Sequence, residues 1–163
     1  MSTANHNLSL YNPAEIPSAE NFRFAVLVAD WNKEITSALC DGAVKTLIEC
    51  RAKKENIAIL YVPGSFELSG GAAMIASSGN YDAVICLGCI IQGETRHFDF
   101  IAQAVAIGLT NISIQYNLPV IFGVLTTDNM FQASERAGGK LGNKGVEAAL
   151  TAIRMIELKK QLR

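Results

Sequence analysis

Short apolar stretches alternate with amphipathic stretches along the chain, and this alternation predicts the fold. Four stretches are dominated by apolar, often β-branched residues: 22–29, 57–62, 83–89 and 120–126. Runs of this kind are typical of strands that are buried on both faces of a parallel sheet.

The segments between and after these strands repeat apolar residues at helical spacing. The clearest helices are predicted over residues 35–52, 98–116, 129–137 and 146–162, with a glycine-rich break at residues 138–145. The element order is βαβαβαβα. With right-handed crossovers, this order predicts a three-layer α/β/α sandwich around a four-stranded parallel sheet.

The first 21 residues have no apolar periodicity and contain Pro13 and Pro17. Within them, residues 8–11 could form a short edge strand added to a sheet, including that of a neighbouring subunit, or belong to a disordered arm. We therefore divide the chain into an N-terminal arm, residues 1–21, and a single domain, residues 22–163.

Composition removes several classes of protein. The net charge of −1 over 163 residues gives no electrostatic reason to bind nucleic acid. No apolar run approaches the roughly 20 residues that span a bilayer, and residues 1–21 lack the features of a signal peptide. We expect a soluble, cytoplasmic protein with neither a nucleic acid nor a membrane as partner.

The four cysteines are Cys40, Cys50, Cys86 and Cys89. Their number and context do not fit a secreted disulfide scaffold, so reduced thiols are expected. Cys86 and Cys89 have C-x-x-C spacing, but an odd offset within one strand points the two side chains to opposite faces. We expect structural or site-lining cysteines and no metal site.

Unusual residues follow the predicted strands at their carboxyl ends, where open parallel sheets bind ligands. They occupy residues 30–32, 63–67, 92–97 and 126–128. Trp31 and Phe66 lie in two of these loops. Their rings could stack on a heteroaromatic ligand or plug the end of the sheet, and the pattern alone leaves both alternatives open.

His97 is the only histidine of the predicted domain, because His6 lies in the N-terminal segment. Proton transfer by an imidazole near neutral pH would therefore fall to His97. The turn at residues 93–95 leads into the helix that begins near His97, and a helix N-terminus favours an anion. Arg136 offers a bidentate partner for such an anion, although spacing does not show whether it reaches this loop.

Two familiar nucleotide motifs are absent. No G-x-G-x-x-G follows the first strand, and Gly139-Lys140 is followed by leucine where a P-loop needs Ser or Thr. Redox chemistry with a bound cofactor is therefore disfavoured.

Four ordered blocks carry a family resemblance: residues 62–68 (VPGSFEL), 88–100 (GCIIQGETRHFDF), 119–127 (PVIFGVLTT) and 136–145 (RAGGKLGNKG). They resemble the 6,7-dimethyl-8-ribityllumazine synthase family of riboflavin biosynthesis, and the match runs from about residue 22 to the C-terminus. The resemblance implies a flavodoxin-like sheet. It also implies condensation of 5-amino-6-(D-ribitylamino)uracil with 3,4-dihydroxy-2-butanone 4-phosphate, which yields the lumazine, phosphate and water without a metal or cofactor.

The resemblance also implies the role of individual residues. Those that hold the pyrimidine and its ribityl chain are Trp31, Ser65, Phe66, Glu67, Cys89, Ile90, Ile91 and Phe122. Those that hold the phosphate are Glu94 and Thr95 through their backbone, Arg136, and less strongly Lys144. Imine formation needs protons moved at each step, and His97 is the expected acid–base catalyst.

Three positions depart from the family pattern. Gln92 stands where many members carry arginine, which removes one positive charge near the anion. Glu94 puts a carboxylate into the phosphate segment, so we expect its N–H to face the phosphate and its side chain to point away. Ser69 replaces a common proline and can cap the following helix.

Family members build their sites between subunits of a pentamer, and many assemble pentamers into an icosahedral shell. The compact connection at residues 138–145 resembles the shell-forming members, so we expect a shell. Riboflavin synthase is a candidate partner. The alternatives are a flavin carrier and a structural shell with a decayed site, and the presence of His97 and Arg136 argues against both.

Overall fold

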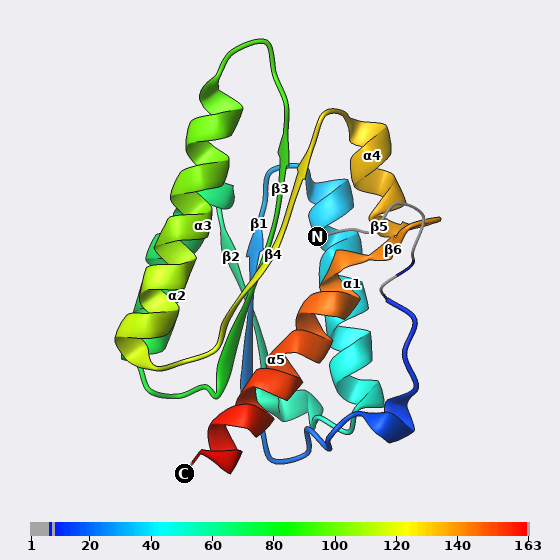
Figure 1. The fold of residues 1–163 in the computed structure, drawn as a ribbon, viewed down its shortest axis with the longest axis vertical. Coiled ribbons are helices and arrows are strands. Elements are labelled where there is room, and N and C mark those ends of the chain that lie inside the picture. The colour runs from blue at the N-terminus through cyan, green and yellow to red at the C-terminus, as the bar shows by residue number, and fades with distance from the viewer. Residues whose placement is uncertain (1–6, 8, 163) are drawn as a thin grey trace.

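A parallel sheet lies between two helical layers in the computed structural model, which describes residue 7 and residues 9–162 (Figure 1). The strand order is β2-β1-β3-β4, and all three pairings are parallel. The strands are β1 (Phe24–Ala29), β2 (Ile57–Val62), β3 (Ala83–Ile91) and β4 (Val120–Thr127). The predicted flavodoxin-like, three-layer sandwich is confirmed, and every predicted strand end lies within two residues of the observed one.

Helices cover both faces of the sheet. On one face lie α1 (Lys33–Glu49) and α5 (Lys144–Gln161), and on the other lie α2 (Leu68–Ser77) and α3 (His97–Tyr116) (Figure 1). Short 3-10 turns are formed by η1 (Pro13–Glu15), η2 (Lys54–Asn56) and η3 (Ser65–Glu67).

The connection from β4 to α5 differs from the prediction. It contains the short helix α4 (Met130–Glu135) and an antiparallel hairpin of β5 (Ala137–Gly139) and β6 (Gly142–Asn143). The sequence pattern predicts the short helix and a glycine-rich break but no hairpin. Positive φ angles at Gly138 and Gly142 allow the chain to reverse within so few residues.

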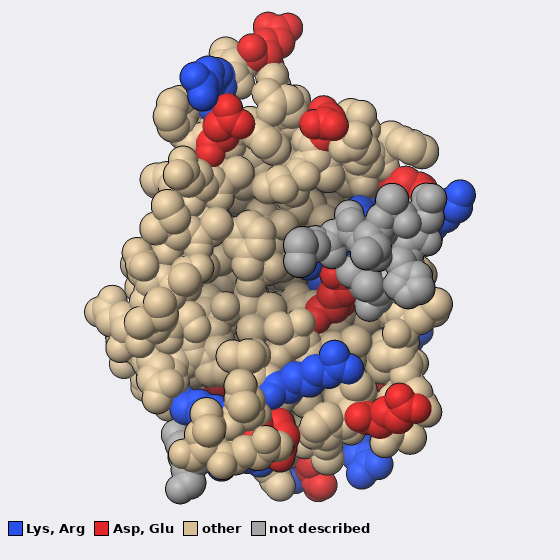
Figure 2. Space-filling model, in the orientation of Figure 1, with Lys and Arg blue, Asp and Glu red and all other residues tan. Residues whose placement is uncertain are grey.

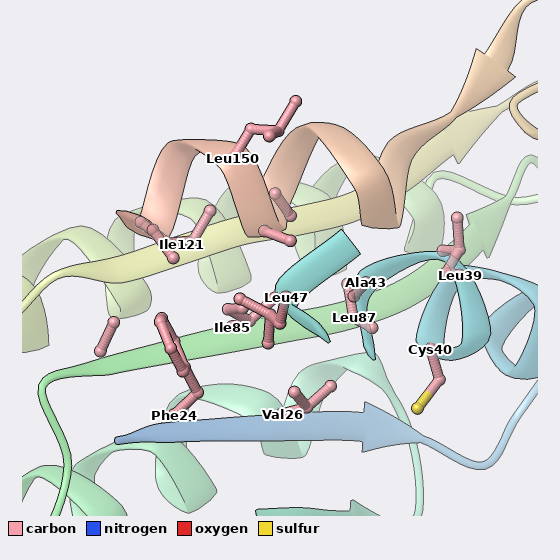
Figure 3. Close-up of a cluster of buried hydrophobic side chains, with 14 of the residues drawn as sticks. Phe24, Val26, Leu39, Cys40, Ala43, Leu47, Ile85, Leu87, Ile121 and Leu150 are labelled. Atoms are coloured by element: carbon pink, nitrogen blue, oxygen red, sulfur yellow. The ribbon is translucent and has the colours of Figure 1, made fainter. Parts of the chain in front are cut away.

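Side chains of the strands alternate between two apolar cores. Phe24, Val26, Ile85 and Leu87 pack with Leu47 and other residues of α1 and α5 (Figure 3). The intervening residues of the same strands pack against α2 and α3. Burial of the strands on both faces explains why their sequences are apolar runs with no polar alternation.

The cysteines follow this alternation. Cys86 packs in the core beneath α2 and α3, and Cys89 packs in the opposite core, as predicted. All four cysteines are unpaired and buried. Burial raises the pKa of the Cys89 thiol to about 11 and raises the pKa of the Cys86 thiol as well, so both are neutral thiols near pH 7.

Residues 9–21 contact α1 and the β5–β6 hairpin. The Asn143 N–H donates to Ser9 Oγ at 2.9 Å, and Tyr11 Oη donates to the Glu49 carboxylate. The side chains of Ile16 and Ala19 are buried. Residues 9–11 form no strand within this chain, and Leu8 of the predicted edge strand, like His6, lies outside the described residues. Pairing of this segment with a neighbouring subunit stays a prediction.

Across residue 7 and residues 9–162, we find no helix that combines the length and the apolar character needed to cross a bilayer.

Candidate functional site: two pockets at the carboxyl end of the sheet

The loops that follow β1, β2 and β3 enclose a pocket of about 640 Å³, which we call the tryptophan pocket. It lies beyond the carboxyl ends of the strands, next to β1. The strand order changes direction at β1, because β2 lies on one side of it and β3 on the other. This is the expected ligand position in an open parallel sheet. Its lining residues are Trp31, Asn32, Gly64, Ser65, Phe66, Glu67, Cys89, Ile90, Ile91, Gly93, Thr95, His97, Phe98 and Ile101.

Two aromatic side chains stand exposed at this pocket. Trp31 is 71% exposed and Phe66 is 56% exposed. Rings that plugged the end of the sheet would be covered by neighbouring atoms, so the exposure of both rings favours the ligand-stacking alternative of the sequence analysis. The walls between them come from Cys89, Ile90 and Ile91, where β3 runs beyond β1.

The η3 turn brings Ser65 against β3. A side chain at Gly88 would collide with Ser65 Oγ, because an added Cβ would lie 2.6 Å from that oxygen. Glycine at position 88 therefore lets the turn close onto the strand. Ser65 Oγ is buried and has no hydrogen-bond partner among the described residues. An unpartnered buried hydroxyl at a pocket wall is available to a polar ligand such as a sugar alcohol.

The helix α3 starts at the pocket with His97 as its first residue. The His97 N–H donates to Thr95 Oγ1 at 3.4 Å, a long hydrogen bond across the first turn. The imidazole belongs to an exposed residue, so it can exchange protons with solvent and with a bound molecule. The first turn of a 20-residue helix also gives this end of the pocket a partial positive charge.

A second pocket, of about 690 Å³, lies among the end of β4, α4, the hairpin and the start of α5. We call it the arginine pocket, because Arg136 lines it together with Lys140 and Lys144. Arg136 donates from Nη1 to the Leu141 carbonyl and from Nη2 to Glu147 Oε1, each at 2.8 Å. Lys144 Nζ donates to the other oxygen of Glu147 at 3.1 Å.

The start of α5 fixes these cations. Asn143 caps the helix, because its Oδ1 accepts from the N–H groups of Gly145 and Val146, and its Nδ2 donates to the Ala38 carbonyl of α1. A Cβ at Gly145 would overlap the Leu39 carbonyl, so glycine is needed for this close approach of α5 to α1. Arg136 and Lys144 thus share one carboxylate and leave net positive charge at the arginine pocket.

The structure brings together most, but not all, of the predicted site residues. The arginine pocket is lined by Arg136 and Lys144. The tryptophan pocket is lined by nine others: Trp31, Ser65, Phe66, Glu67, Cys89, Ile90, Ile91, Thr95 and His97. Glu94 is exposed and lines neither pocket. Phe122 is 36% exposed on the edge strand β4 and also lies outside both pockets.

The two pockets share no lining residue. Figure 1 shows α3, which borders the first, and α4, which borders the second, on opposite sides of β3 and β4. Within the part of the chain that the structure describes, no Lys or Arg lines the tryptophan pocket. An aromatic half-site without a lining cation and a cationic half-site therefore lie apart on one chain.

Comparison with known proteins assigns the family. The family model described as 6,7-dimethyl-8-ribityllumazine synthase matches residues 21–160. A protein of that name from Cytophaga hutchinsonii is 57% identical over 156 residues, which cover 96% of this chain and 98% of the relative. Another of that name, from Phocaeicola vulgatus, is 48% identical over 162 residues, which cover 99% and 96% respectively. The chain belongs to the 6,7-dimethyl-8-ribityllumazine synthase family.

The resemblance drawn from the four sequence blocks is thereby confirmed, together with the enzyme class that the lumazine synthase name denotes. The roles assigned to single residues stay predictions. In the described residues, we find no group of three or more His, Cys, Asp or Glu side chains that could hold a metal ion.

Among the residues to which the sequence pattern gave no role, two hold parts of these pockets in place: Asn32, which lines the tryptophan pocket, and Glu147, which pairs with the cations of the arginine pocket. Asn32 donates from its side-chain amide to the Cys89 carbonyl at 2.9 Å, and Glu147 pairs with both Arg136 and Lys144. The i, i+3 spacing of Lys144 and Glu147 on one helix could have revealed the second. Nothing local could have revealed the first, because 57 residues separate its partners.

Proposed function

We propose that the protein condenses 5-amino-6-(D-ribitylamino)uracil with 3,4-dihydroxy-2-butanone 4-phosphate to 6,7-dimethyl-8-ribityllumazine, with release of phosphate and water. The observation that carries this proposal is the tryptophan pocket, in which two exposed rings, an unpartnered serine hydroxyl and one histidine surround about 640 Å³. A flat heteroaromatic ring with a polyol chain and an amine fits these groups. Membership of the family supports the same reaction.

In this proposal the pyrimidine stacks on Trp31, and Ser65 and Glu67 hold its ribityl hydroxyls. Phe66 and the backbone of residues 89–91 bound the ring. Holding the amine and the ketone in contact supplies much of the rate enhancement, because a bimolecular step becomes effectively unimolecular.

His97 is the proposed proton carrier. The amine attacks the ketone to give a carbinolamine, and water leaves to give an imine; each step needs a proton moved between nitrogen and oxygen. Phosphate then leaves, and ring closure expels a second water. Imidazole can both accept and donate protons near neutral pH, and His97 is the only histidine at the pocket among the residues that the structure describes.

The phosphate needs positive charge that the tryptophan pocket does not hold. The N-terminal end of α3, with the N–H groups near Glu94 and Thr95, supplies part of it. Arg136, with Lys144 as a weaker contributor, supplies the rest from the arginine pocket of a neighbouring subunit. The separation of the two half-sites on one chain supports this arrangement, because a head-to-tail ring would place one against the other.

The face formed by α2 and α3 supports assembly into such a ring of subunits. The helices α2 and α3 carry a single Asp and no Lys or Arg, and Figure 2 shows the corresponding side of the molecule almost free of charge. Met74, Phe100, Ile107 and Ile114 are exposed there. Surfaces of this kind are typical of subunit interfaces. We propose a pentamer in which this face is buried and Phe122, exposed on β4, covers the pyrimidine of a neighbour.

We further propose that pentamers assemble into an icosahedral shell, since the compact hairpin adds no insertion between β4 and α5. Light scattering should then show particles much larger than a pentamer. Only pentamer-sized particles across a range of buffers would contradict the shell without affecting the proposed reaction.

The remaining parts of the proposal concern organisation and location. Residues 1–21 form an arm and residues 22–163 a single domain. Four unpaired cysteines are typical of a reducing compartment, which supports a place in the cytoplasm. Riboflavin synthase, which acts on the lumazine, is the proposed protein partner.

The proposed reaction is tested by incubating the protein with both substrates and measuring lumazine fluorescence and phosphate together. We expect equal amounts of the two products, and neither when one substrate is left out. Binding of the pyrimidine without any lumazine would instead indicate a carrier, and binding of neither substrate would indicate a purely structural shell.

A further inference from the structure

The side chain of Asn32 has an unusual hydrogen-bond partner. Asn32 is the N-cap residue of α1, and its carbonyl accepts from the N–H groups of Ile35 and Thr36. An asparagine at this position ordinarily caps the helix with its side chain. Here the side chain makes no capping hydrogen bond, and its Nδ2 donates to the Cys89 carbonyl at 2.9 Å.

The backbone of Asn32 is left-handed, with φ 58° and ψ 47°. Asparagine tolerates this conformation better than most residues that have a Cβ. At this left-handed residue the chain turns from β1 into α1, and its side-chain amide contacts β3. Conformation and side-chain chemistry thus both suit asparagine at this position.

The hydrogen bond extends the contact between two strands. β1 pairs with β3 only as far as Val28, which lies beside Leu87, so the Cys89 carbonyl lies beyond the last paired residue. The Asn32 amide supplies a donor where the strand has ended. The loop after β1 is therefore tied to the wall of the tryptophan pocket that Cys89, Ile90 and Ile91 form.

Two hydrogen bonds hold the chain at Trp31 and at the residue that follows it. The Trp31 N–H donates to the Pro63 carbonyl at 3.2 Å, and the next residue is held by Cys89. The ring lies over Gly64, where an added Cβ would come within 3.4 Å of Trp31 Cε3. Because 71% of Trp31 is exposed, side-chain packing within the chain contributes little to its placement, and the backbone ties must do so.

We propose that Asn32 is a positioning residue for Trp31: its amide, bound to the Cys89 carbonyl, holds the tryptophan ring at the height and angle at which the pyrimidine stacks. This inference rests on the proposed function for the identity of the ligand. Its structural part, that Asn32 orders Trp31, stands independently of the ligand.

The test uses the only tryptophan of the chain as its probe. Asn32→Asp keeps the shape of the side chain and the tolerance for a left-handed backbone but replaces the donor by an acceptor that repels the Cys89 carbonyl. Time-resolved fluorescence anisotropy of the unliganded, assembled protein should show a larger fast component for Trp31. Asn32→Gly, which keeps the left-handed turn and lacks the amide, should show the same increase.

The chain offers a matched control in Asn117, which is also left-handed, with φ 47° and ψ 44°, and ends α3. Asn117→Asp and Asn117→Gly should leave the Trp31 anisotropy unchanged. In steady-state kinetics, Asn32→Asp should raise the pyrimidine KM by roughly tenfold, the typical effect of losing one hydrogen bond that orders a binding group, with little change in the butanone phosphate KM.

Anisotropy decays of Asn32→Asp and Asn32→Gly that match wild type would overturn the positioning role, whatever happens to the melting temperature. An equal rise of both KM values would also overturn it, because the substitution would then not act through the placement of the Trp31 side chain. If wild type makes no lumazine, the proposed function fails, whereas the anisotropy comparison still decides whether Asn32 holds Trp31.

Discussion

Replacing His97 with alanine should lower kcat by about 10²-fold or more, the usual contribution of a positioned general acid–base group. The Kd of the pyrimidine should stay nearly constant, since the stacking and hydroxyl contacts that we propose for it come from Trp31, Ser65 and Glu67, which line the same pocket. Single-turnover lumazine formation measures the first quantity, and quenching of Trp31 fluorescence by the bound pyrimidine measures the second.

The neighbouring Arg96 provides the control for this variant. Arg96 is the N-cap residue of α3, is exposed, and pairs only with Asp99 of the same helix turn among its described ion-pair partners. Arg96→Ala disturbs the same helix start without removing a proton carrier, so its kcat should stay close to wild type. A His97→Ala enzyme with wild-type kcat would show that protons move by another route, and the role of His97 would be wrong.

The second large effect is expected at Arg136. Arg136→Ala should raise the butanone phosphate KM by roughly 10²-fold, because it removes the proposed charge-assisted contact to the phosphate. Arg136→Lys should recover part of the loss, since it restores the charge without the planar fork. Initial rates at saturating pyrimidine, with the butanone phosphate varied, give the KM of each variant.

Stability must be separated from binding in this case. Arg136 also bonds Glu147 and the Leu141 carbonyl, so its removal leaves a largely buried carboxylate with only Lys144 as an ion-pair partner. The double variant Arg136→Ala, Glu147→Gln removes that unpaired charge and should regain thermal stability while the KM stays high. Arg154→Ala, an exposed site on α5, serves as the surface control. An unchanged KM in the folded Arg136→Ala enzyme would remove this residue from the phosphate site.

The strands were predictable because burial on both faces leaves a sequence signature that does not depend on distant partners. The runs ending at Ala29 and Val62, for example, end where the observed strands end. The opposite orientation of Cys86 and Cys89 followed from strand geometry alone. The loops at the carboxyl ends, and hence Trp31 and His97, could be placed at one rim because parallel strands share their direction.

Features that depend on contacts between distant residues could not be predicted in this way. The Asn32 amide reaches a carbonyl 57 residues away, and nothing near Asn32 in the sequence indicates that partner. The β5–β6 hairpin depends on two glycines with positive φ within a loop that also suits an irregular turn. The presence of two separate pockets is likewise a property of the folded chain. Residue types indicate a cationic side chain that could bind phosphate, but they do not indicate on which side of β4 it lies.

We propose from the division into two pockets that one active site is built from the tryptophan pocket of one subunit and the arginine pocket of its neighbour. Co-expression of His97→Ala and Arg136→Ala chains tests this claim directly. Assayed at a butanone phosphate concentration far below the KM of Arg136→Ala, each variant alone should be nearly inactive. In mixed rings of subunits, a site is complete when His97 comes from an Arg136→Ala chain and Arg136 comes from a neighbouring His97→Ala chain. Random assembly of equal amounts gives about a quarter of all sites this composition.

A matched control pairs His97→Ala with Phe66→Ala. Both changes lie in the tryptophan pocket, so no site in a mixed ring receives both intact residues, and activity should not exceed the average of the two single variants. If the two pockets form one shared site, the co-assembled His97→Ala and Arg136→Ala chains should have about a quarter of wild-type activity. Activity no higher than the average of those two variants would contradict the shared site.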